Sequence, residues 1–364
     1  MKISQRIFLL MAAIAMLSVT SCKDDEGPEP LPAKEAQELL SSMGSDMELT
    51  MQEVMSTPGM LTIKNFSSLI DEEDDVYVKN KLASLIALPS SPFNVGIRSY
   101  SLVDEDFGTL RTTGTYTWDF EEATWSYSPE PEDKLIYLFP SDPQQTANNA
   151  MLTLSNYTEV VVGEDFFPKT FDVVIKVGDS NVFELTYVAA VTESALTSVD
   201  INLSMGLFEI VFNADVTSQA NNLVMTVGHS MKKSDVTLSS SNLELTIEGL
   251  LTLDPYEIED DAELIPSRVR GFIQMGQVKA QLDIGLQQVL NVWNNATTSV
   301  ELVDAFNNNI ILDFFTFPAG QKMGFVVWRW VDIPGTLTPC FQFNDGSQKP
   351  FFEVIGFDLS AFMK

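Results

Sequence analysis

The most constraining feature of this chain is a period-two alternation of apolar and polar side chains between residues 171 and 253. Within residues 199–205, for example, every second side chain is apolar and the intervening ones are polar. Successive side chains of a β-strand point to opposite faces, so this period predicts strands with one buried and one solvated face. Short turn sequences such as residues 178–181 separate the alternating runs, which is typical of an antiparallel meander.

A second alternating segment, residues 115–127, is rich in aromatic side chains. Tyr116 and Trp118 alternate with polar residues before a turn, and Trp125 and Tyr127 do so after it. This pattern predicts an aromatic hairpin. Further strands are expected at residues 135–139, 150–154, 278–284, 310–317, 325–331, 341–343 and 351–357.

Residues 33–56 have helical rather than strand periodicity. Apolar side chains recur at three- and four-residue steps, and they include Met43, Met47, Met51 and Met55. An apolar helix face normally packs onto the rest of the protein, and this is the favoured interpretation. Methionine also adapts to varied apolar partners, so a ligand-facing role for this stripe is the alternative.

Two shorter helices are also expected. Residues 60–70 have the composition of a short helix. Thr298 and Glu301 have the spacing of a capping box, which predicts a helix through Phe306.

Together these patterns predict a mainly β (α+β) fold, in which a long antiparallel β-meander carries an N-terminal amphipathic helix packed on the sheet. No Gly/Ser-rich linker interrupts residues 33–364. A sheet protein of this length is able to form one unit, so we expect a single domain over that range.

Charge and composition exclude several functions. The formal net charge is −30, which argues against nucleic-acid binding because phosphate neutralisation dominates that interaction. The chain has one histidine, His229, which we expect to be a solvent-facing turn residue, and Cys340 is expected to be a small buried apolar residue.

Motifs for nucleophilic, phosphate-binding or metal-dependent chemistry are missing from the sequence, and the acidic clusters at 71–75 and 257–263 are expected to be solvated surface. The prediction is therefore a protein that is not an enzyme and that has no cofactor and no metal site.

The N-terminus carries a different kind of signal. Lys2 and Arg6 precede an uncharged apolar run at residues 7–19, which has the anatomy of a secretory signal and is short for a membrane span. The run ends in Val19-Thr20-Ser21-Cys22, which resembles a bacterial lipobox. That resemblance implies that residues 1–21 are a lipoprotein signal peptide and that Cys22 is lipidated, which anchors the chain to a membrane.

Residues 22–32 are acidic and proline-rich, as expected of an extended tether. Lys23, Asp24, Asp25 and Glu26 follow the cysteine and resemble the export signal of surface-exposed lipoproteins of the Bacteroidota. The resemblance implies attachment to the outer membrane with exposure at the cell surface, and attachment at the periplasmic face is the alternative.

Two functions remain open after these exclusions. The favoured one is a non-catalytic interaction or structural lipoprotein, with a protein or glycan partner. Tyr116, Trp118, Trp125 and Tyr127 are its candidate contact residues if they project outwards; if they project inwards they belong to the core. The alternative is a carrier of lipid or another hydrophobic ligand, with a cavity between helix 33–56 and the sheet, by analogy with periplasmic lipid-carrying lipoproteins.

Overall fold

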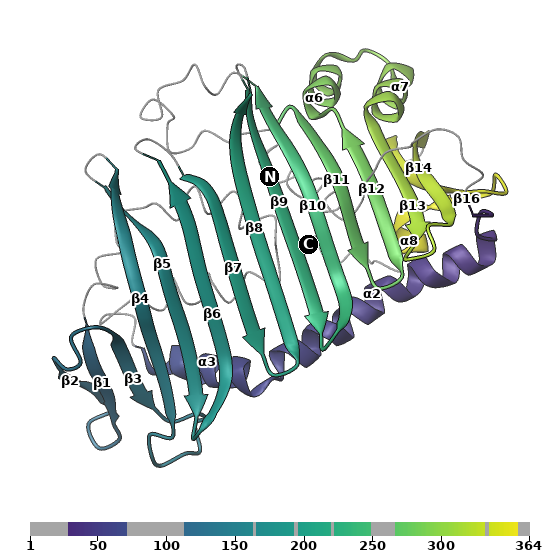
Figure 1. Cartoon of the computed structure of the whole chain (residues 1–364). Coiled ribbons are helices and arrows are strands. Elements are labelled where there is room, and N and C mark those ends of the chain that lie inside the picture. Colours follow the sequence, from purple (N-terminus) through teal and green to yellow (C-terminus); the bar gives the residue numbers. More distant parts are fainter. Residues whose placement is uncertain are drawn as a thin grey trace. The chain divides into compact units, whose positions relative to one another are not determined.

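The architecture comes from a computed structural model, which describes residues 28–70, 113–162, 165–192, 196–219, 222–248, 266–331 and 335–355. Its strands form a 16-stranded sheet in the order β16-β15-β14-β13-β12-β11-β10-β9-β8-β7-β6-β5-β4-β3-β1-β2. From β3 onwards, neighbours in the sheet are also neighbours in the sequence, which is a meander (Figure 1). The prediction of a mainly β fold with a long meander and an N-terminal helix is therefore confirmed.

The helices are α2 (Ala33–Met55), α3 (Pro58–Leu69), α6 (Leu286–Asn295), α7 (Ser299–Asn309) and α8 (Phe351–Val354). The first strands are β1 (Gly114–Asp119), β2 (Thr124–Ser128), β3 (Leu135–Phe139), β4 (Ala150–Val162), β5 (Asp165–Val177), β6 (Ser180–Val191), β7 (Leu196–Met205) and β8 (Phe208–Gln219). The later strands are β9 (Asn222–Lys233), β10 (Val236–Glu248), β11 (Arg268–Met275), β12 (Val278–Ile284), β13 (Ile310–Thr316), β14 (Lys322–Val331), β15 (Thr336–Phe343) and β16 (Gln348–Pro350).

The chain divides into two compact units. The first comprises Met1–Leu49, Val216–Gly228 and Thr237–Lys364, and the second comprises Thr50–Asp215 and His229–Val236. The expectation of a single domain over residues 33–364 remains a prediction.

In the second unit, alternation buries one face of the strands. Phe183, Leu185 and Ala189 of β6 are buried, whereas the residues between them are mostly exposed. Phe171 of β5 stacks on Tyr187 of β6 with ring centroids 4.7 Å apart, and burial raises the pKa of Tyr187 to about 12. Burial therefore favours the neutral, protonated form of the Tyr187 hydroxyl.

In the first unit, the α6–α7 pair adds a helical layer next to β13, β14 and β15, and Figure 1 shows the two helices side by side. The predicted capping box is present: the Thr298 side chain accepts from the Glu301 N–H, and the Glu301 carboxylate accepts from the Thr298 N–H. Both helix-start donors are therefore satisfied within the turn itself.

Three features differ from the sequence-based expectation. Strand β1 pairs parallel with β3, so the sheet is mixed rather than purely antiparallel. Strand β11 was not predicted, because Gly271 and Phe272 interrupt its alternation. The predicted strand at 351–357 is wrong at its start, which forms α8; Pro350 cannot donate to a strand ladder, and a helical turn buries Phe351 and Val354 together.

Candidate functional site

The aromatic hairpin β1–β2 is the strongest candidate site. Tyr116 pairs with Tyr127 and Trp118 pairs with Trp125 across the hairpin, and Tyr116 is also opposite Tyr137 of β3. Residues opposite one another in a sheet share a face, so the four hairpin aromatics lie on the face of Tyr137, which is buried. On this face Tyr116, Trp118 and Trp125 are half-buried and Tyr127 is 51% exposed, so they pack against the apolar face without being fully buried in the core.

The rings of this face contact one another in a continuous cluster. Tyr116 lies between Tyr127 and Tyr137, with centroid distances of 4.9 and 5.0 Å. Trp125 contacts Tyr137 edge to face at 5.2 Å and Phe66 of α3 at 5.9 Å. Edge-to-face and offset contacts of this kind are the favoured aromatic geometries, so the ring faces are used for packing rather than held free for a sugar.

Polar contacts fix two of these rings in place. The indole Nε1 of Trp125 donates to the carbonyl of Leu69 at 3.2 Å, and the Tyr127 hydroxyl donates to the carbonyl of Thr113 at 2.9 Å. The Tyr127 ring also covers Gly114, where an added Cβ would lie 2.7 Å from the ring. Gly114 has φ +128°, so glycine is needed there both for the backbone and for the ring.

The backbone edge of β2 is the exposed part of the hairpin. Among the described strands β2 is the last in the sheet order, and Thr124, Ser126, Tyr127 and Ser128 are all exposed. An edge strand presents unpaired backbone N–H and C=O groups, and natural proteins usually protect such edges with charge, proline or short length. Strand β2 contains neither charge nor proline.

The opposite end of the sheet order has the usual protection. Strand β16 is three residues long and contains Lys349 and Pro350. Short length, a lysine and a proline all discourage strand addition. The two terminal strands of the described sheet therefore differ, and of these two only β2 lacks both charge and proline.

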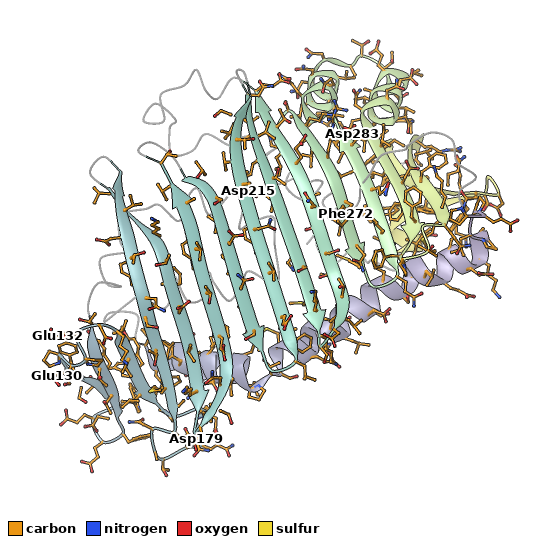
Figure 2. All side chains as sticks on the ribbon, viewed as in Figure 1. Glu130, Glu132, Asp179, Asp215, Phe272 and Asp283 are labelled. Carbon is orange, nitrogen blue, oxygen red and sulfur yellow. The ribbon has the colours of Figure 1, made fainter. Side chains whose placement is uncertain are left out.

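Carboxylates stand on both sides of β2. Glu121 and Glu122 lie in the turn before it, Glu130 and Glu132 lie after it, and all four are exposed. None belongs to an ion pair formed within the described residues. The Asp119 carboxylate accepts from the N–H groups of Glu121 and Glu122, which fixes the first pair relative to the strand. Figure 2 shows Glu130 and Glu132 together at this margin of the sheet.

The methionine stripe of α2 is only partly buried. Met43 is buried, Met47 and Met51 are half-buried, and Met55 is 51% exposed. The helix residues with no exposed surface are Ala36 and Leu40. The apolar contact of α2 therefore includes three of the four methionines to different degrees and leaves Met55 outside it.

The lipidation and export residues lie outside the described residues: Cys22, Lys23, Asp24, Asp25 and Glu26. Cys340 lies in β15 and is half-buried, and burial is the main cause that raises the pKa of its thiol. A thiol with a raised pKa is a weak nucleophile at neutral pH.

The placement of His229 corrects an expectation. It lies within β9 and is half-buried, instead of lying in a solvent-facing turn, and burial lowers its pKa to about 4. The sequence misled because Gly228 and Ser230 beside it resemble turn residues, whereas β9 continues through them to Lys233.

Sequence reasoning missed a charged network in the first unit. On one face of β11 and β12, Arg268 donates to Asp283 at 2.6 Å and Arg270 lies 3.4 Å from the same carboxylate. Lys279 lies 4.1 Å from the Phe272 ring centroid, and Figure 2 labels Phe272 and Asp283 on this face. Strand pairing brings these residues together, so no local motif could have predicted the network.

The first unit also contains a buried tryptophan. Trp328 of β14 is 4% exposed and packs against Phe306 of α7, whereas Trp330 is 37% exposed. The Nε1 of Trp328 has no hydrogen-bond partner among the described residues. Sequence parity placed both tryptophans on one face but could not tell which of them α7 covers.

Within the described residues no group of three His, Cys, Asp or Glu side chains is placed to hold a metal ion, and no described helix is long and apolar enough to cross a membrane. The chain matches no known protein family. Comparisons with curated proteins and with solved structures also found no match.

Proposed function

We propose that this chain is a non-catalytic, lipid-anchored interaction protein of the outer membrane that is exposed at the cell surface and contacts its partner through the β1–β2 hairpin. The observation that carries the proposal is the β2 edge, which is exposed and uncharged and is backed by a fixed aromatic cluster. A rigid support with open backbone groups is suited to binding, because little ordering is needed when the partner arrives.

The anchor is supported by the N-terminal sequence, in which Cys22 follows a signal-like run. We expect Cys22→Ala to leave the signal uncleaved and to abolish labelling of the mature chain by a radioactive fatty acid. Protease added to intact cells should degrade the unaltered protein, which distinguishes surface exposure from the periplasmic face. Normal maturation and lipid labelling of Cys22→Ala would contradict the anchor.

The non-catalytic assignment is supported by the state of the two most reactive side chains. His229 has a pKa of about 4 and is therefore a weak base at neutral pH, and the Cys340 thiol has a raised pKa. A hydrolase screen of the full chain should give no turnover above buffer. Turnover that persists through a second, different purification would overturn this assignment.

The hydrophobic-carrier alternative requires the α2 methionines to line a continuous apolar site. Exposed Met55 and half-buried Met51 favour the interaction role over that arrangement. Native mass spectrometry of the chain purified from its own membrane decides between them. We expect the mass of the chain with its anchor alone; a second lipid-sized adduct would favour the carrier.

Site-specific photo-cross-linking tests the hairpin itself. A benzophenone side chain at position 127 should cross-link to a cell-surface component, because Tyr127 is 51% exposed beside the open edge. Leu207 is 63% exposed in a turn of the same unit and provides the matched control position. Equal cross-linking at positions 127 and 207, or none at position 127, would contradict a role for the hairpin.

A further inference from the structure

We infer that the β2 edge takes up a basic, extended peptide segment of a partner protein as an added antiparallel or parallel strand. This inference rests on the proposed function and names the partner chemistry of the same hairpin. It goes beyond a general interaction role because it assigns the backbone of Thr124–Ser128, rather than the aromatic ring faces, as the contact.

The two terminal strands of the described sheet differ in how their backbone edges are protected. Strand β16 carries Lys349 and Pro350 and is short, whereas β2 is exposed at every residue except the half-buried Trp125 and has no charge or proline. Peptides bind such edges by strand addition, in which main-chain hydrogen bonds supply affinity and alternate side chains supply specificity. The aromatic cluster packs β2 against β1, with Tyr127 and Trp125 each held by a hydrogen bond.

The two faces of β2 would present different side chains to an added strand. Trp125 and Tyr127 lie on the face of the aromatic cluster, and Thr124, Ser126 and Ser128 lie on the other. Ser126 directs its hydroxyl back to the carbonyl of Thr117 at 3.1 Å, so it leaves the edge unobstructed. A bound segment should therefore place uncharged β-forming residues opposite β2, since β-branched residues pair well beside aromatic ones.

The carboxylates around β2 favour a basic partner. Glu121 and Glu122 precede β2 and Glu130 and Glu132 follow it, so a five-residue uncharged strand is bracketed by carboxylates. Lysine or arginine at both ends of the added segment would lie beside these carboxylates. Their attraction favours association and fixes the register of the added strand on β2. The formal net charge of −30 strengthens the same preference at long range.

The same carboxylates argue against a second copy of this chain as the occupant. An antiparallel pairing of two β2 strands centred on Ser126 would bring Glu122 of one copy opposite Glu130 of the other. Like charges directly opposite across a strand pair are destabilising, so the flanking acids select against self-association while they favour a basic segment.

The test uses the full chain in detergent and three fluorescent nine-residue peptides, with anisotropy as the readout. The basic peptide KKTVTVTKK should bind at least about tenfold more tightly than the acidic peptide EETVTVTEE, because of the flanking carboxylates. The peptide KKTVPVTKK has the same charge but a central proline, and it should lose binding because proline removes a ladder donor. Hydrogen exchange should show new protection confined to residues 124–128 in the complex with KKTVTVTKK.

Charge reversal on the protein provides a second, independent measurement. The double variant Glu122→Lys/Glu130→Lys sets two lysines beside the remaining Glu121 and Glu132, so it should remove the preference and bind the basic and acidic peptides with about equal affinity. Asp179→Lys is the matched control: Asp179 is exposed in the β5–β6 turn, away from β2 in Figure 2, and its reversal should leave the preference unchanged. Far-ultraviolet circular dichroism checks that the variants are folded.

Each result decides the inference. Equal binding of KKTVTVTKK and KKTVPVTKK, protection outside residues 124–128, or an unchanged preference for the basic peptide in the double variant would overturn it. A neutral polysaccharide that binds with protection at Trp118 and Tyr127, while the peptides do not bind, would replace the peptide by a glycan. If the peptides fail but position 127 still cross-links in cells, only this inference fails; if position 127 is also silent, the proposed function fails with it.

Discussion

Trp125 and Trp328 sit in two similar aromatic clusters, one in each compact unit. Trp125 packs edge to face against Phe66 of α3, with ring centroids 5.9 Å apart and planes at 68°. Trp328 packs against Phe306 of α7 at 4.9 Å, also with planes at 68°. In both clusters a helix phenylalanine fixes a strand tryptophan by the same ring geometry.

The clusters differ at one polar atom. Trp125 donates its indole N–H to the Leu69 carbonyl at the end of α3, whereas the indole N–H of Trp328 is buried with no partner among the described residues. Leaving a buried donor unpaired costs about 1–3 kcal/mol. The comparison shows that ring packing alone holds the indole of Trp328, whereas packing and a hydrogen bond together hold the indole of Trp125.

The largest expected effect comes from deleting the helix ring in each cluster. Phe66 has no exposed surface and contacts Trp125, Tyr137 and Phe139, so Phe66→Ala should lower the free energy of unfolding by about 4 kcal/mol. Phe306→Ala should cost about 3 kcal/mol, because one of its ring contacts, Trp293, is 54% exposed. Urea denaturation measures both, and a larger loss for Phe306→Ala would break this ranking.

The next largest loss of stability is expected when the hydrogen bonds to the Trp328 backbone are removed. The Asn307 side chain accepts from the Trp328 N–H at 2.7 Å and donates to the Trp328 carbonyl at 2.9 Å. Asn307→Ala should cost about 2–3 kcal/mol, because it leaves two backbone groups of a buried residue unpaired. The neighbouring exposed Asn308 makes no such contact, so Asn308→Ala should be near neutral; equal losses would contradict the assignment.

A pH experiment separates the two units, because His229 belongs to the unit that contains Trp125. Its pKa is about 4 in the folded chain and about 6.5 when unfolded, so below pH 6.5 the unfolded chain binds a proton that the folded chain excludes. The contribution of His229 to the free energy of unfolding is complete above pH 6.5 and decreases towards pH 4. At pH 5 about 2 kcal/mol of it is lost.

Urea titrations of the unaltered chain and of His229→Gln at pH 7 and pH 5 measure this loss. The variant should lose less stability than the unaltered chain over the same interval, and the difference isolates His229 from the many carboxylates. Identical pH dependence in the two proteins would show that His229 does not titrate in this window.

The smallest effect tests the contrast between the two tryptophans directly. Benzothienylalanine has nearly the shape of tryptophan but has sulfur in place of the indole N–H. At position 125 it should cost about 1 kcal/mol, because the bond to Leu69 is lost. At position 328 it should be neutral or stabilising by about 1 kcal/mol, because an unpaired buried donor is removed. Equal destabilisation at both positions would show that Trp328 also has a partner in solution.

Local sequence patterns predicted most of the strands and their turns. The alternation over β5 to β10 predicted which side chains are buried, because side-chain direction in a strand follows from position alone. The helix at 33–56 was predicted for the same reason, since spacing at three and four residues determines a helix face. The capping box at Thr298 was also predicted, because all of its partners lie within four residues.

The candidate site could be predicted only in part. The sequence identified Tyr116, Trp118, Trp125 and Tyr127 as one group, since alternation places them on one face. It could not tell whether that face is open, because α3, which packs on it through Phe66, comes from a distant part of the chain. It also could not show that β2 is a terminal strand, because period-two alternation is the same at an edge and in the middle of a sheet.

By itself, then, the sequence determined the strand and helix periods, the turns, the strong negative charge and the signal-like N-terminus of this protein. The tertiary structure decided the parallel β1–β3 pair, the burial of His229, the start of α8, the unpaired Trp328 donor and the open β2 edge. The physical reason is the distance along the chain over which each property is determined. A side chain's direction depends on the residues next to it, whereas its burial and its strand pairing depend on which distant segments pack against it.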